Sequence, residues 1–360
     1  MKHFRTLPLT LLLLSACTKE PSATGGAAPA TARTYTWKMV TTWPKNFPGL
    51  GTAPERFAEA VKAMSGGRLT IKVYGAGELV PALEVLDAVS GGTAAMGHGA
   101  AYYWKGKAPE AQFFAAVPFG LNARETDAWL RYGGGLELWR ELYAQFGLIP
   151  FPGGNTGVQM GGWFNQEITS LADVKGLKMR IPGLGGDVFE RAGGVPVLLP
   201  GGEIFTALQT GAIDATEWVG PYNDLAFGLH EAAEYYYTPG WHEPATALEF
   251  IVNREAFEAL PEDLQAIVRH GTEAAAASML HEYTARNAEA FERLKREHGV
   301  EVRQFPPEVL ARFRELSEEV LAEQAESSPL AQRIYDSYTA FRDRSRPYQV
   351  ATESAYDAAR

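Results

Sequence analysis

The sequence contains only one cysteine in 360 residues, Cys17. A single cysteine excludes an internal disulfide framework and a cysteine-rich zinc site. Basic residues are also scarce, at 33 against 43 acidic ones, which gives a formal net charge of −10. We expect such a chain to avoid nucleic acid and anionic lipid surfaces. If its ligand is an anion, a local positive group must therefore hold it.

Long apolar runs are also absent, except for a short one at the N-terminus. After the basic residues Lys2 and Arg5, residues 7–14 are apolar, and small residues precede Cys17. This run is too short to span a bilayer as a helix, which indicates an export signal. Cysteine directly after the cut resembles a lipoprotein lipobox, in which the thiol is acylated; the alternative is a plain secretory signal with a chance cysteine. We expect residues 1–16 to be a lipoprotein signal peptide, and the mature protein to be periplasmic or extracytoplasmic and lipid-anchored through Cys17.

The usual motifs of enzymes are missing or incomplete. Residues 230–234 (HEAAE) lack the second histidine of a zinc-protease helix, and no G-x-S-x-G is present. Residues 183–187 (GLGGD) lack the lysine of a phosphate-binding loop and predict a tight strand-to-helix turn. His98 and His242 stand alone, so we interpret each as a satisfied core or turn histidine. The sequence therefore predicts a protein that is not an enzyme.

The order of predicted elements indicates an α/β fold with crossover connections. In the first half, strands are expected at residues 35–40, 69–73 and 94–96, with helices at 54–64 and 80–90 between them. A second unit repeats the alternation, with strands at 177–180, 195–198 and 213–216 and helices at 186–192 and 203–209. The Gly-rich segment 151–164 is expected to cross between the two units. Long helices follow, at about 261–297, after Pro306-Pro307, and in an amphipathic tail from about 330 to 360.

Three stretches carry a family resemblance: residues 176–182 (GLKMRIP), residues 205–218 (FTALQTGAIDATEW), and the spacing of Asn253, Phe257 and Leu260-Pro261. Together they resemble the solute-binding subunit of a tripartite ATP-independent periplasmic (TRAP) transporter, over roughly residues 35–310. The resemblance implies a periplasmic-binding-protein-like fold, with two α/β lobes around a central cleft and long C-terminal helices. It also implies delivery of a captured small organic acid to a TRAP membrane permease.

The resemblance leads to an expected division of the chain. Residues 17–33 are small and rich in Pro, Gly and Ala, which is typical of a flexible tether. Lobe I is expected to comprise residues 34–156 and 246–286, and lobe II residues 157–245 and 287–325. Residues 326–360 are expected to form a C-terminal amphipathic helix, a possible dimerisation element. Its Tyr338 and Phe341 suggest exchange across a homodimer, although the helix could equally pack on its own chain.

Arg180 is the leading candidate for ligand binding. It falls at the end of a predicted strand, and open α/β units bind ligands at the carboxyl ends of their strands. A guanidinium binds a planar carboxylate bidentately, which lysine cannot do. The resemblance implies that Arg180 is the family's carboxylate-binding arginine. The alternative is a surface arginine that pairs with a nearby acid such as Asp187.

Within the family, the sequence resembles the branch that binds 2-oxo- or 2-hydroxymonocarboxylates with a metal ion. The resemblance implies metal ligation by Gln159, Glu217, the backbone oxygen of Trp218, and Glu243. Structural roles remain alternatives for these residues: a helix cap for Glu217, a solvated turn for Glu243 and ordinary cleft lining for Trp218. The expected substrate-binding residues are Arg180, Gln159, Asn155, Tyr103, Trp218 and Glu243.

Charge balance favours a divalent ion. Arg180, two glutamates and a monocarboxylate sum to −2, and unbalanced buried charge costs on the order of several kcal/mol per ion. Oxygen ligands favour calcium, with sodium as the alternative. Bulky aromatic walls such as Tyr103 suit a small acid, so lactate and pyruvate are expected. Three readings stay open: a receptor for a C4-dicarboxylate, a receptor for an ATP-driven importer or sensor kinase, and an extracytoplasmic metal-dependent enzyme acting on a carboxylic acid.

Overall fold

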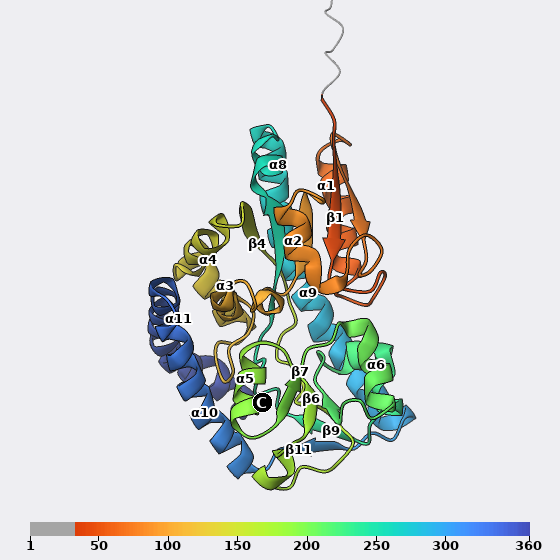
Figure 1. The fold of residues 1–360 in the computed structure, drawn as a ribbon, viewed down its shortest axis with the longest axis vertical. Coiled ribbons are helices and arrows are strands. Elements are labelled where there is room, and N and C mark those ends of the chain that lie inside the picture. The colour runs from red at the N-terminus through yellow and green to blue at the C-terminus, as the bar shows by residue number, and fades with distance from the viewer. Residues whose placement is uncertain (1–32) are drawn as a thin grey trace, which may run out of the picture. The chain divides into compact units, whose positions relative to one another are not determined.

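The computed structural model describes residues 33–360 of the chain. The expected signal peptide, Cys17 and the tether up to residue 32 lie outside the described residues. Within residues 33–360, no helix is long and apolar enough to cross a membrane. The fold is α/β, as predicted, and contains two separate sheets (Figure 1).

The first sheet has the strand order β2-β1-β3-β10-β4. Its parallel strands β1, β2 and β3 alternate with helices as the sequence predicts, whereas β10 is antiparallel to both β3 and β4. The predicted strand at 94–96 begins two residues before the observed one, because Met96 is the first residue that pairs with β1. The elements are β1 (Tyr35–Thr41), α1 (Thr52–Met64), β2 (Leu69–Tyr74), η1 (Ala82–Glu84), α2 (Val85–Ser90), β3 (Met96–Gly99), β4 (Leu148–Asn155) and β10 (Ala247–Asn253).

The second sheet has the strand order β11-β9-β5-β8-β6-β7. Strands β6, β7 and β8 are parallel, so their carboxyl ends share one edge, and β5 and β9 pair antiparallel to each other. The elements are β5 (Gly162–Phe164), η4 (Leu171–Val174), β6 (Lys178–Arg180), α5 (Gly183–Arg191), β7 (Val195–Val197), α6 (Gly201–Gln209), β8 (Ala215–Thr216), α7 (Pro221–Phe227), η5 (Leu229–Glu231), β9 (Tyr235–Thr238) and β11 (Val302–Gln304).

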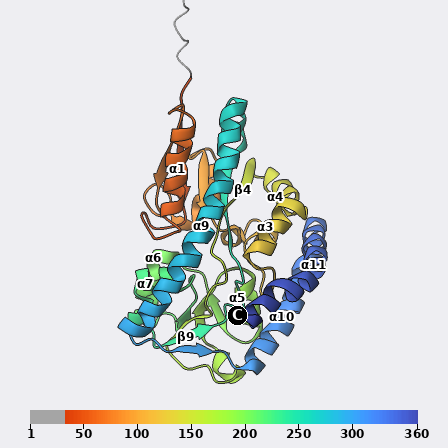
Figure 2. The ribbon, with the colours of Figure 1, turned by 180° about the vertical axis from the view of Figure 1, so that it is seen from behind.

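Two extended segments and one helix join the sheets. Residues 156–161 run from β4 to β5, and residues 239–246 run from β9 back to β10. The two segments lie side by side, since the N–H of Thr156 donates to the carbonyl of Thr246 at 3.1 Å. The long helix α9 (Glu262–Glu297) contacts β4 and α1 and, nearer its C-terminal end, α7 (Figure 2). The proposed lobe boundaries at 156/157 and 245/246 fall in the two extended segments.

Several helices pack beside the first sheet without being predicted by the periodicity. Among them, α3 begins at a capping box formed by Asn122 and Glu125. Their bounds are η2 (Ala101–Trp104), η3 (Pro109–Phe114), α3 (Ala123–Tyr132), α4 (Gly135–Ala144) and α8 (Arg254–Glu258). In the core, the ring of Phe114 stacks between those of Trp129 and Trp139.

The C-terminal helices follow α9 and return to the first sheet's side. They are α10 (Pro307–Glu326), α11 (Pro329–Gln349), η6 (Val350–Ser354) and α12 (Ala355–Ala359). In α11, the Tyr338 hydroxyl accepts from the Leu121 N–H at 2.7 Å, and its ring meets that of Trp129 at 5.1 Å. Tyr338 is thus buried against its own chain. Exchange of this helix across a homodimer stays a prediction.

Candidate functional site

The candidate site forms where the carboxyl ends of β6 and β8 meet the two segments that join the sheets. Arg180 is the last residue of β6 and is paired with Thr216 in β8, so Glu217 follows at the same edge. The Glu217 N–H donates to the Arg180 carbonyl at 3.1 Å. Sheet register alone therefore brings this arginine and this carboxylate together, at the edge where α/β folds bind ligands.

Arg180 is 1% exposed and hydrogen-bonded at each nitrogen. Its Nη1 is ion-paired with Glu217. Its Nη2 donates to the Tyr103 hydroxyl at 3.1 Å and its Nε to the Leu199 carbonyl at 3.2 Å. The guanidinium carbon also lies 5.2 Å from the ring centre of Trp218. Although burial opposes the charge, Tyr103 and Glu217 raise the pKa of Arg180, so it stays cationic. The alternative partner, Asp187, pairs with Lys105 instead.

Gln159 and Glu243 face each other across the two segments between the sheets. The Gln159 Nε2 donates to Glu243 Oε2 at 2.7 Å and to the Thr246 hydroxyl at 2.9 Å. Thr246 in turn donates to the same Glu243 oxygen. Burial, and then the charge of Glu217, raise the pKa of Glu243 well above its usual value. Glu243 thus carries an ionisation cost that a nearby cation would reduce.

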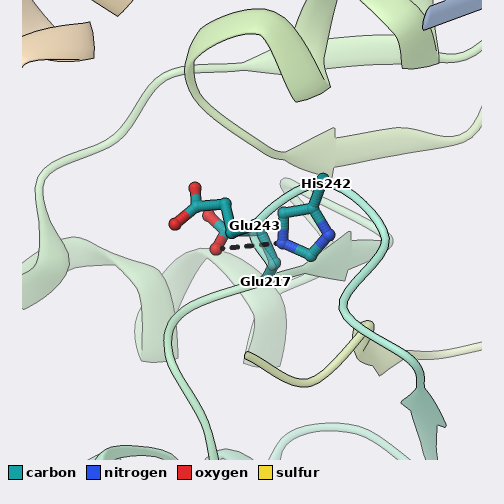
Figure 3. Close-up of side chains that lie close together, drawn as sticks. All are labelled: Glu217, His242 and Glu243. Atoms are coloured by element: carbon teal, nitrogen blue, oxygen red, sulfur yellow. Dashed lines mark ion pairs between the residues drawn. The ribbon is translucent and has the colours of Figure 1, made fainter. Parts of the chain in front are cut away.

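His242 adds a third potential ligand, which the sequence analysis did not predict. Its Nε2 lies 3.5 Å from Glu217 Oε2, and Glu243 lies beside the pair (Figure 3). One potential ligand atom from each residue lies within 4.8 Å of the others, the only such group among residues 33–360. Neither ring nitrogen of His242 has a hydrogen-bond partner. The prediction of a satisfied histidine is therefore wrong for His242.

The same prediction holds for His98. Its Nδ1 accepts from the Trp43 indole at 2.8 Å, and its Nε2 lies 3.1 Å from the Gly153 carbonyl. Burial lowers the pKa of His98 to about 4, so the ring is neutral at ordinary pH. His98 is therefore a core residue with both nitrogens satisfied.

The unpaired oxygens of this cluster fit a cation. Glu217 Oε2 and Gln159 Oε1 are buried without a hydrogen-bond partner, which is costly unless something binds them. When Glu243 is also ionised, two carboxylates against one guanidinium leave an excess negative charge. Oxygen donors from glutamate and glutamine suit a hard cation such as calcium or sodium. The residues present therefore fit the predicted ion.

The other predicted residues surround the same place. Asn155, at the end of β4, is 1% exposed; its Oδ1 accepts from the Gly157 N–H at 2.9 Å, and its Nδ2 has no partner. Trp218 contributes its ring, and its indole N–H is likewise unpaired. The structure thus brings Tyr103, Gln159, Arg180, Glu217, Trp218 and Glu243 into one buried cluster, and Asn155 is buried just before the segment that carries Gln159. Besides His242, sequence reasoning missed Thr246, although it stands three residues after Glu243.

A small internal cavity lies beside the cluster, with a volume of about 10 Å³. That is roughly the space of one water molecule. Residues that follow strands of both sheets line this cavity, and most of them are aromatic or aliphatic. The lining residues are Trp43, Leu50, Tyr102, Tyr103, Thr156, Gln159, Trp218, Val219, Thr246 and Leu248. A space of this size is too small for an organic acid, so a ligand at this place would need the walls to move apart.

Comparison with known proteins gives consistent matches. Residues 39–328 match DctP, described as bacterial extracellular solute-binding protein, family 7. A monocarboxylate 2-oxoacid-binding periplasmic protein of Nostoc is 44% identical over 344 residues, covering 96% of this chain and 93% of that protein.

Two solved structures are also similar. A TRAP periplasmic solute-binding protein from Pseudoalteromonas atlantica, with bound sodium and pyruvate, is 45% identical with a TM-score of 0.89. One from Colwellia psychrerythraea, with bound calcium and pyruvate, is 44% identical with the same TM-score. Each match covers 91% of this chain and 100% of the other.

Proposed function

This chain belongs to the DctP family of bacterial extracellular solute-binding proteins, and we propose that it captures a small 2-oxo or 2-hydroxy monocarboxylate together with a metal ion. The family consists of solute receptors of TRAP transporters and not of enzymes, in agreement with the predicted absence of catalysis. Pyruvate and lactate are the proposed ligands, and a TRAP membrane permease is the proposed partner. Lipid anchoring through Cys17 remains part of the proposal.

One observation carries the proposal: a buried arginine shares its site with two buried glutamates and with unpaired oxygens. An arginine at this edge suits a carboxylate, and the surplus acids suit a cation. The similar proteins also support the proposal. One is named as a monocarboxylate 2-oxoacid-binding protein, and the two solved structures contain pyruvate with sodium or with calcium.

In the proposed complex, Arg180 holds the ligand carboxylate, with Tyr103 and Asn155 as further hydrogen-bond donors. Gln159, Glu217, the backbone oxygen of Trp218, and Glu243 would hold the cation, with His242 as a neighbour. When bound, the cation supplies positive charge for the 2-oxygen and the carboxylate of the acid. Calcium balances the site charge, and sodium is the alternative.

The proposed mechanism is closure of two lobes around the ligand. Tyr103 follows a strand of the first sheet and Arg180 ends a strand of the second, and their hydrogen bond joins the two parts across the site. Lys105, which follows η2, forms an ion pair with Asp187 of α5 in the same way. Driving closure from 1:99 to 99:1 needs about 5.5 kcal/mol of differential binding. The hydrogen bonds of Arg180 to the ligand and the ligation of the cation are proposed to be complete only in the closed form. Together they would supply this difference in binding free energy.

Isothermal titration calorimetry tests the proposal directly. Metal-free protein is prepared and divided into three samples, to which calcium, sodium or a chelator is added. Pyruvate, lactate and succinate are then titrated into each sample. We expect heat from pyruvate or lactate that depends on the cation. Heat from succinate alone would overturn the proposed ligand class and favour a C4-dicarboxylate receptor, and metal-independent binding of pyruvate would overturn the proposed cation site.

A further inference from the structure

A pair of histidines lies outside the carboxylate site, after the C-terminal end of α7. His230 belongs to η5, and its HEAAE segment lacks a second histidine of its own. The fold supplies one from elsewhere in the chain: the ring of His298, which follows the last residue of α9, has its centre 4.1 Å from that of His230. Two imidazoles that are 68 residues apart in sequence thus become neighbours.

The side chain of His230 is shielded from solvent and lacks hydrogen bonds. Its side chain is 7% exposed, and neither ring nitrogen has a hydrogen-bond partner among the described residues. A buried polar group without a partner costs free energy, so such a group calls for a ligand or an ordered water. A ring nitrogen without a hydrogen bond can offer its lone pair to a metal.

The surroundings provide acidic groups and space. His230, His298 and Glu231 do not all have ligand atoms within 4.8 Å of one another, but Glu231 Oε1 lies 3.8 Å from the His230 Nε2, and its 68% exposed side chain can turn toward the rings. A surface hollow of about 480 Å³ is lined by His230, Glu231, Glu234 and His298. The nearby Arg293 is paired with Glu297. The carboxyl end of a helix such as α9 also favours a cation.

We propose that His230, His298 and Glu231 form a second metal site, which binds a divalent transition-metal ion of the zinc class. Imidazole nitrogens with one carboxylate suit zinc, copper and nickel, whereas calcium prefers oxygen ligands alone. The site is therefore chemically distinct from the proposed calcium or sodium site. A metal bound here would join η5 to the end of α9 and stabilise the folded protein.

Zinc titration of the tag-free, metal-free mature protein tests this site. Calcium and pyruvate are present in excess, so that the cluster around Glu217 is occupied. We expect His230→Ala and His298→Ala each to weaken zinc binding by about tenfold or more, the loss of one ligand. His270→Ala is the matched control, because His270 lies 3.5 Å from Glu273 but is an exposed histidine on α9. Its zinc affinity should equal that of the wild type.

Copper(II) EPR provides a second readout that does not depend on affinity. The wild-type spectrum should show coupling to two imidazole nitrogens, and each alanine variant coupling to one fewer. Melting curves without metal identify a variant that is simply unfolded, in which case His230→Gln or His298→Gln replaces it. The proposal is overturned if the wild type binds no zinc at up to roughly 1 mM, a very weak affinity. It is also overturned if neither histidine variant changes zinc binding, or if His270→Ala weakens it equally.

Discussion

Arg180 is the residue whose loss should most weaken ligand binding. We expect Arg180→Met to lower pyruvate affinity by about 100-fold, because losing one partner of a buried charge pair costs on the order of 2–5 kcal/mol. Arg180→Lys should recover little, since an ammonium cannot make the two parallel hydrogen bonds of a guanidinium. Calorimetry with calcium present measures both variants.

The control for this change must separate binding from folding. Arg180→Met leaves Glu217 buried without its ion-pair partner, so the melting temperature is measured first. Arg191→Met, at the end of the next helix α5, removes an arginine whose partner Glu323 is exposed, and it should bind pyruvate normally. Unchanged pyruvate affinity in a folded Arg180→Met would refute the proposed role.

The buried acids predict a specific pH dependence of the cation-free protein. Burial, and then Glu217, raise the pKa of Glu243, and burial raises the pKa values of Asp224 and Glu249 to about 7. A carboxyl whose pKa is raised in the folded state binds more protons there than when unfolded. Its stabilising contribution is therefore complete below the unfolded pKa and is lost as pH rises through the folded pKa.

Thermal melts with chelator should thus show the wild type losing stability between pH 5 and 8. Glu243→Gln should lose less over the same range, since its amide does not titrate. Glu234→Gln, an exposed acid outside the site, is the control and should follow the wild type. Parallel curves for all three proteins would contradict the assignment of Glu243. With calcium present, affinity for the ion should rise with pH, because the carboxylate must lose its proton.

At the scale of single residues, sequence reasoning succeeded where strand position decides the place of a side chain. Arg180 and Glu217 end or follow neighbouring parallel strands, so their proximity follows from the sheet edge. Gln159 and Glu243 meet only because two distant connecting segments run together, and the family resemblance suggested them, not their spacing. His242 was missed because a lone histidine carries no spacing signal.

At the scale of helices and strands, the sequence pattern predicted the alternating strands and helices of the two α/β units well. It predicted the helices and strands between these units poorly. The helix α9 was found because proline and acids mark its start and its length is unmistakable. The strand β10 is buried along almost its whole length, so it has no alternation of polar and apolar residues to indicate a strand. The start of α3 did carry a readable signal, the capping pair Asn122 and Glu125.

The packing of α11 predicts a measurable role for one hydroxyl. Tyr338→Phe removes the acceptor of the buried Leu121 N–H. An unsatisfied buried donor costs about 1–3 kcal/mol, so urea denaturation should show a loss of that size. Tyr348→Phe is the matched control, because Tyr348 lies on the same helix but is 69% exposed. Equal losses in both variants would contradict the contact.

For the whole molecule, the C-terminal helix poses the question of assembly. If α11 is exchanged between two copies, truncation before Leu330 should leave a monomer. The truncated chain should also be less stable, because Trp129 and Phe113 lose the ring of Tyr338 that covers them. Light scattering measures the mass of both forms. An unchanged assembly size would count against the exchange.

The proposed cation and acid should bind cooperatively, because one ion pair links their sites. In this structure the carboxylate of Glu217 pairs with Nη1 of Arg180, the guanidinium to which the ligand carboxylate is proposed to bind. If Glu217 turns to the cation, the guanidinium is freed for the acid, so each partner should improve the affinity of the other.

Linkage requires the two effects to be equal, and couplings of about 1–3 kcal/mol are typical. We expect calcium to raise pyruvate affinity by at least about fivefold, and pyruvate to raise calcium affinity by the same factor. Calorimetry in both orders measures the cycle, and independent affinities would show that Arg180 and Glu217 do not exchange partners on binding.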